Sequence, residues 1–108
     1  MTLKEFKEKC QGLKFEEERS FSDDYGEFVI AASEIEQWYK KFEEIFGQPK
    51  NKQGAQPAKE DLALSHDYGG IRANQVLYKR DFEKGSVLAM FWPWGDGSLI
   101  TLKVIIKS

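Results

Sequence analysis

The last third of the chain, residues 75–107, constrains the fold more than any other segment. Three runs rich in β-branched and aromatic residues are predicted as strands at about 73–80, 86–92 and 98–107. The two short connections between these runs both end in glycine, as hairpin loops often do. Together these features predict an antiparallel β-meander.

The last predicted strand alternates between apolar and polar side chains, so its two faces are easily told apart. One face carries four apolar residues and the other carries a threonine and two lysines, namely Ile100, Leu102, Val104 and Ile106 against Thr101, Lys103 and Lys107. Leu99 and Ile105 interrupt the polar face. We therefore expect the apolar face to be buried and the other face to be covered in part.

Two amphipathic helices are predicted in the first half of the chain. Residues 2–13 begin with the capping box formed by Thr2 and Glu5, and residues 33–46 begin with a second one formed by Ser33 and Glu36. Both segments repeat apolar residues at helical spacing. Each helix therefore has an apolar face that can pack against a sheet.

The remaining segments are less regular. Residues 28–32 are predicted as a short strand. In residues 15–21 apolar and polar side chains do not alternate regularly, so the sequence leaves open whether this segment is a strand. Residues 48–60 form a polar connector, which predicts a mobile surface loop. Residues 62–65 are either a short strand or the last turn of a small helix, and the glycine-rich segment 66–70 predicts a tight bend.

The length of 108 residues predicts one domain, residues 1–108. The order of elements predicts the α+β class. In that fold, an antiparallel sheet of three to five strands is covered on one face by one or two amphipathic helices.

Charge and cysteine content limit the classes of function. The net charge of −2 gives no general affinity for nucleic acid or anionic membranes. The lone Cys10, the lack of a signal-peptide pattern and the absence of a long apolar run predict a cytoplasmic protein with no membrane association. Residues 15–36 hold eight acidic residues against Arg19. This segment is either a solvated face or a surface for a basic partner.

Catalytic and metal chemistry find little support in the sequence. His66 is the sole histidine, and only Asp67 or Tyr68 is placed in sequence to assist it in acid–base work. One histidine and one cysteine cannot form a zinc site. We therefore predict no catalytic residue, no metal and no cofactor, and expect the protein not to be an enzyme. An enzyme or ligand binder centred on His66 is the less favoured alternative.

The connection at 92–97, Trp-Pro-Trp-Gly-Asp-Gly, holds the strongest functional signal. Pro93 ends the strand, so two indoles lie at the rim of the sheet, either exposed or folded over the core. Exposed tryptophans are typical anchors of protein interfaces. We therefore predict a non-enzymatic protein-interaction module, such as an inhibitor, immunity-type or accessory protein, acting as a monomer or homodimer. Its expected partner-binding residues are Trp92, Trp94, Tyr78 and Asp96.

A second interpretation is a single-stranded nucleic-acid-binding protein. Basic residues are interleaved with aromatic ones along the meander, as in sheets that stack unpaired bases. The residues expected to bind nucleic acid in that case are Arg72, Lys79, Arg80 and Phe91. The negative net charge opposes this interpretation.

Overall fold

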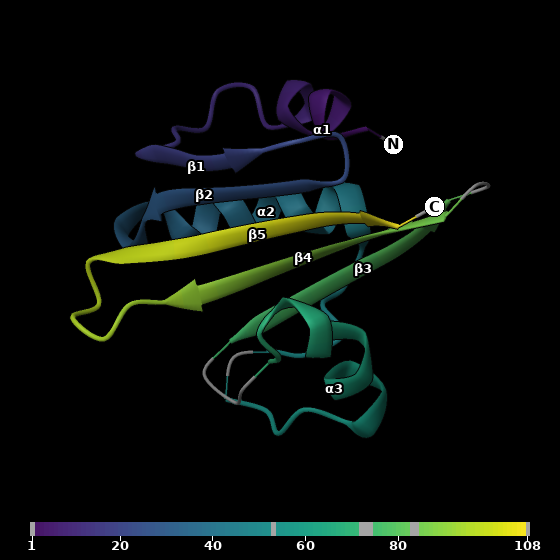
Figure 1. The fold of residues 1–108 in the computed structure, drawn as a ribbon. Coiled ribbons are helices and arrows are strands. Elements are labelled where there is room, and N and C mark those ends of the chain that lie inside the picture. Colours follow the sequence, from purple (N-terminus) through teal and green to yellow (C-terminus); the bar gives the residue numbers. More distant parts are fainter. Residues whose placement is uncertain (1, 53, 72–74, 83–84, 108) are drawn as a thin grey trace.

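The computed structural model describes residues 2–52, 54–71, 75–82 and 85–107. It is built around one antiparallel sheet with helices on both sides (Figure 1). The strands are β1 (Glu17–Phe21), β2 (Tyr25–Ala31), β3 (Val76–Phe82), β4 (Gly85–Pro93) and β5 (Leu99–Lys107). The α-helices are α1 (Leu3–Lys9), α2 (Ile35–Phe46) and α3 (Lys59–Ser65), and two short 3₁₀ turns are η1 (Ala32–Glu34) and η2 (His66–Tyr68).

The strand order β1-β2-β5-β4-β3 joins an N-terminal hairpin to the C-terminal meander. β2 pairs with β5 in a regular register that sets Phe28 opposite Leu102, and β3 pairs with β4 so that Tyr78 lies opposite Ala89. All neighbouring strands are antiparallel. The predicted α+β class and the antiparallel meander are therefore confirmed, with five strands in the sheet.

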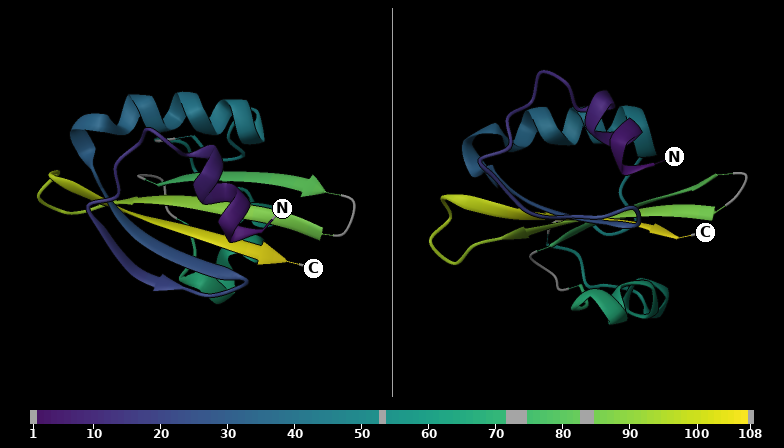
Figure 2. Two further views of the ribbon diagram at one scale, coloured as in Figure 1. Left: turned by 90° about the horizontal axis from the view of Figure 1, so that it is seen from above. Right: turned by 45° about the horizontal axis from the view of Figure 1, so that its top comes forward.

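Helices α1 and α2 cover one face of the sheet (Figure 2). The core beneath them is aromatic, and Phe42 of α2 lies at its centre. The Phe42 ring centroid is 4.8 Å from that of Phe91, 5.3 Å from that of Tyr78 and 5.6 Å from that of Phe6. Edge-to-face and tilted ring pairs at such distances add stability beyond area burial alone. The amphipathic stripe predicted for α2 therefore serves as core.

The opposite face of the sheet is covered by α3 and η2 (Figure 2). A second, smaller cluster lies beneath them, composed of Ile71, Leu77, Leu88, Met90 and Ile105. The expected partial cover over Ile105 is thus confirmed, since this residue is only 2% exposed. Helices were predicted on one face of the sheet only, so the position of α3 on the other face differs from that prediction. No helix in the described ranges is long and apolar enough to cross a bilayer.

The two predicted capping boxes have different outcomes. The Thr2 hydroxyl accepts a hydrogen bond from the Glu5 backbone N–H at 3.1 Å, although α1 ends at Lys9, earlier than predicted. The box predicted at Ser33 and Glu36 is wrong, because Glu34 precedes α2 and no side-chain capping bond forms. The chain leaves β2 directly into η1, which includes Ser33, so the helix begins only afterwards.

Segment 15–21 contributes the edge strand β1. Its register against β2 shifts between Glu18 and Ser20, and all five of its residues are exposed. Because both faces of β1 are exposed to solvent and a bulge interrupts its register, no selection for alternating apolar and polar residues acts on it. The sequence of this strand therefore lacks the usual period of two. The bulge and the charged side chains also blunt this edge of the sheet.

Segment 48–60 is less free of structure than predicted. Asn51 is only 2% exposed, and its backbone forms an isolated bridge with Leu77 beside β3. Lys59 and Glu60 already belong to α3, so residues 62–65 are helical and not a strand. A polar connector is held in place here by backbone hydrogen bonds, which composition alone does not reveal.

Candidate functional site

The turn between β4 and β5 is closed by a set of local hydrogen bonds. The Trp94 N–H donates to the Leu99 carbonyl at 2.9 Å, and the Gly97 N–H donates to the Trp94 carbonyl at 3.0 Å. Asp96 Oδ1 accepts from both the N–H and the hydroxyl of Ser98, and these bonds lower the pKa of its carboxyl group. Gly97 supplies the positive φ of +75° that the turn needs. Asp96 is therefore exposed but engaged in holding the turn.

Trp94 lies half-buried with its ring held from two sides. Its indole N–H donates to the Thr101 hydroxyl at 2.9 Å. The Arg19 guanidinium of β1 lies 5.4 Å from the ring centroid, within cation–π range. Arg19 also pairs with Glu17 at 3.4 Å. The indole is thus fixed in orientation and still partly open to solvent.

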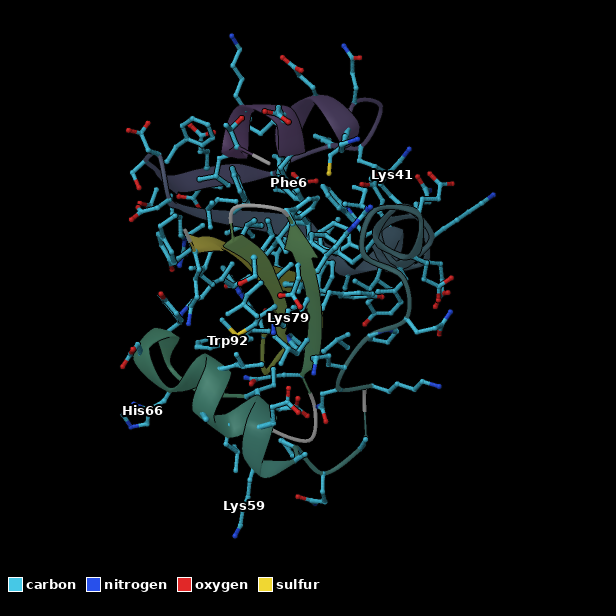
Figure 3. All side chains as sticks on the ribbon, turned by 90° about the vertical axis from the view of Figure 1, so that its right-hand side faces the viewer. Phe6, Lys41, Lys59, His66, Lys79 and Trp92 are labelled. Carbon is cyan, nitrogen blue, oxygen red and sulfur yellow. The ribbon has the colours of Figure 1, made fainter. Side chains whose placement is uncertain are left out.

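Trp92 is held between the sheet and η2, as Figure 3 shows. The Lys103 ammonium lies 3.6 Å from the centroid of its ring and donates to the Tyr68 carbonyl at 3.2 Å. The ring also packs so closely on Gly69 that a Cβ there would collide with it. Trp92 therefore anchors η2 to the sheet, and within the described part of the chain its indole nitrogen has no hydrogen-bond partner.

The other aromatic candidates face the opposite side of the sheet. Tyr78 is 2% exposed and Phe91 is completely buried, and both pack against Phe42 of α2. The four residues predicted to bind a partner are therefore not brought together. The structure leaves Trp94 and Asp96 on one accessible turn and places Trp92 and Tyr78 in separate clusters.

The basic candidates are engaged in local contacts. Lys79 pairs with Asp81 at 3.4 Å. Arg80 donates to the Ile45 carbonyl at 2.6 Å near the C-terminus of α2, where a cation is favoured by the helix dipole. With Phe91 in the core, these side chains do not form a joint surface for stacking bases. The predicted contribution of Arg72 falls outside the described residues.

His66 points away from the molecule (Figure 3). Its side chain is 85% exposed, and the carboxylate of Asp67, 3.4 Å away, is on a side chain that is 83% exposed. Both side chains of this pair are therefore largely solvated, and neither lines any of the cavities found among the described residues. Among the described residues, no group of three potential ligands is placed to hold a metal ion.

Arg19 and Thr101 were not identified from the sequence as site residues. Arg19 lies in β1, the segment that the sequence did not establish as a strand. Its side chain reaches Trp94 because β1 is separated from β5 by β2 alone. The sequence signal for Thr101 was its position on the polar face of the last strand, the face that Trp94 folds over.

No protein-family model matches this chain, and no match was found among curated proteins or solved structures. The geometry of the site is therefore the basis for assigning a function.

Proposed function

We propose that this protein is a non-enzymatic interaction module of the cytoplasm, of an inhibitor, immunity or accessory type, which binds a partner protein through Trp94. The observation that carries the proposal is the half-exposed indole held by Thr101 and Arg19. Tryptophan and arginine are the residue types most enriched at binding hot spots. An indole that is already fixed loses little conformational freedom when a partner covers it.

The neighbouring charges extend this surface, which we call the Trp94 surface: Trp94, Arg19, Glu17 and Asp96. Glu17 and Arg19 alternate in sign on the exposed strand β1, and Asp96 lies at the tip of the adjacent turn. A hydrophobic anchor surrounded by charges of both signs is the usual composition of a transient protein interface. The rim charges would select the partner more than they would strengthen binding.

The cytoplasmic location rests on the state of the lone cysteine. Cys10 is 1% exposed, and burial raises the pKa of its thiol to about 12. A free, unreactive thiol of this kind suits a reducing compartment.

The test compares partner recovery by the wild-type protein with recovery by Trp94→Ala and Arg19→Ala. Leu62→Ala is the matched control, because Leu62 is an exposed apolar residue, at 46%, on the distant helix α3. Truncating a hot-spot residue costs about 2 kcal/mol or more, so we expect affinity for the recovered protein to fall at least about 30-fold with Trp94→Ala. Leu62→Ala should bind like the wild type.

Circular dichroism and thermal melting would first establish that each variant is folded. Recovery of the same protein partner by folded Trp94→Ala would overturn the proposal. So would a single-stranded oligonucleotide, and no protein, whose binding is lost in Trp94→Ala and depends steeply on salt.

A further inference from the structure

Trp92 lies beside the Trp94 surface, on the same face of the sheet. In the register between β4 and β5, Trp92 is opposite Thr101, and opposed side chains of an antiparallel pair lie on one face. Thr101 is also the residue to which the Trp94 indole N–H donates, at 2.9 Å. Both indoles therefore adjoin Thr101, and they differ in that Trp92 is covered by η2 (Figure 3).

The segment over Trp92 consists of α3, η2 and the turn that follows, residues 59–71, and we call it the α3–η2 cover. Leu64, Tyr68 and Ile71 are the side chains of the cover that belong to the second apolar cluster or pack against it, whereas Leu62 is 46% exposed. α3 has seven residues, fewer than a helix needs to be stable alone. Elements with few buried apolar side chains are those that open locally while the rest of a protein stays folded.

Closing the cover is unfavourable for two polar groups. The Trp92 indole N–H is buried without a hydrogen-bond partner among the described residues. The Lys103 ammonium lies on the Trp92 ring and donates to the neutral Tyr68 carbonyl, and burial lowers its pKa although Glu27 acts in the opposite direction. Opening the cover would hydrate both groups, so these two groups favour the open form.

Tyr68 holds the cover closed through two groups that another protein segment can also supply. Its carbonyl accepts a hydrogen bond from Lys103 at 3.2 Å, and the Lys107 ammonium lies 5.4 Å from the centroid of its ring. Neither contact requires η2 in particular. An aromatic residue of a partner protein can make both of them, with its ring and its own backbone carbonyl.

We propose that the α3–η2 cover is an autoinhibitory element, which opens as a unit while the sheet stays folded and thereby adds Trp92 to the Trp94 surface. The partner that binds Trp94 captures the open form by placing an aromatic residue and its carbonyl where Tyr68 lies in the closed form. The identity of the binding surface rests on the proposed function, whereas the opening is a property of the protein alone.

Hydrogen exchange of the native protein, followed by NMR at several urea concentrations below the unfolding transition, tests the opening. The reporters are the amides of Leu62 and Gly70, which are hydrogen-bonded to neighbouring backbone carbonyls, and the Trp92 indole N–H. We expect all three to be protected at least about tenfold less than the amides of the central strand β4, and their exchange to depend less steeply on urea.

Gly69→Ala and Gly70→Ala are a matched pair of variants for the closed contact. Both glycines have a positive φ, +101° and +79°, but of the two only Gly69 would place a Cβ against the Trp92 ring. Gly69→Ala should therefore speed exchange of the Trp92 indole N–H at least about fivefold more than Gly70→Ala. The partner recovered through Trp94 should likewise bind Gly69→Ala at least about fivefold more tightly than Gly70→Ala. Circular dichroism establishes that both variants are folded.

A peptide copy of the cover tests what can occupy its place. The probe is the acetylated peptide with the sequence of residues 59–71, titrated into protein labelled with 5-fluorotryptophan. It should shift the Trp92 signal of Gly69→Ala at a concentration at least about fivefold lower than in the wild type, because the variant's own cover competes less well. The same peptide with Tyr68→Ala should bind more weakly.

Four results would each overturn the proposal. They are exchange of the cover with the protection and urea dependence of β4, exchange of the Leu62 and Gly70 amides without that of the Trp92 indole, equal effects of the two glycine substitutions, and equal binding of the peptide by Gly69→Ala and the wild type. Trp94→Ala should leave exchange of the Trp92 indole unchanged. Failure of the proposed function, seen as partner recovery by folded Trp94→Ala, is therefore distinguishable from failure of this inference.

Discussion

Replacing Gly69 by alanine is expected to destabilise the protein by about 2–5 kcal/mol. Gly69 has a φ of +101°, and in this region a side chain costs about 1–2 kcal/mol of backbone strain. A Cβ at this position would also collide with the Trp92 ring, and forcing an extra carbon into a packed site costs about 1–3 kcal/mol. The sum of the two gives the expected range.

Gly70→Ala is the matched control for this experiment. Gly70 also has a positive φ, +79°, but no atom lies within 4 Å of the position its Cβ would take. This variant should therefore lose only about 1–2 kcal/mol. The difference between the two variants isolates the contact between η2 and Trp92.

Urea unfolding, followed by far-ultraviolet circular dichroism, measures both changes in the free energy of unfolding. In a Trp92→Leu background the collision is removed, so Gly69→Ala should then cost no more than Gly70→Ala. The reasoning fails if Gly69→Ala is no more harmful than Gly70→Ala, or if its excess cost persists without the indole. That result would mean that Trp92 is not packed on η2 and is available as a functional surface.

Two further predictions concern titratable groups. The folded-state pKa of Asp96 lies below its ordinary value of 3.8, so its carboxylate stabilises the turn at neutral pH, and this contribution disappears as the pH falls below about 4 through the folded-state pKa. The stability difference between wild type and Asp96→Ala should therefore shrink as the pH falls from neutrality through the folded-state pKa of Asp96, below about 4. A difference that stays constant until the protein unfolds in acid would contradict this prediction. Cys10, whose thiol pKa is raised to about 12 by burial, should resist iodoacetamide at neutral pH in the folded protein and react once the chain is unfolded. Rapid alkylation under native conditions would show that α1 does not shield this thiol.

The regular strands of the sheet were predictable because burial of one face requires apolar residues at every second position. β5 has one continuous apolar face, and this pattern identifies it as a strand. Ile105 interrupts the opposite, polar face, which indicates that this face of the sheet is also covered in part. β1 lacked such a pattern because it is exposed on both sides and carries a bulge near Arg19. The short helix α3 has no side-chain cap from Ala58, the residue before it, so its start carried no clear sequence signal.

The functional site was predicted in part. The turn containing Trp94 was identified as the strongest functional signal. The sequence did not reveal that Trp92 and Tyr78, predicted to act with Trp94, lie on opposite faces of the sheet. Because consecutive side chains of a strand point to opposite faces, the adjacent positions of Phe91 and Trp92 in β4 already place them on different faces of the sheet. The burial of Tyr78 under α2 depends on the register between β3 and β4, which is a property of the assembled sheet. The contact between Arg19 and Trp94 likewise arises only after β2 pairs with β5.

Fluorine NMR of protein labelled with 5-fluorotryptophan tests the role of Trp94 most directly. The chain has three tryptophans, and Trp38 is fully buried while Trp92 is held under η2. Substitution of each by phenylalanine assigns the three signals. We predict that the Trp94 signal responds to a soluble paramagnetic probe and loses this response when the recovered partner protein is added, while the Trp38 signal is unchanged in both steps. A Trp94 signal that keeps its full response in the presence of saturating partner would contradict binding through this residue.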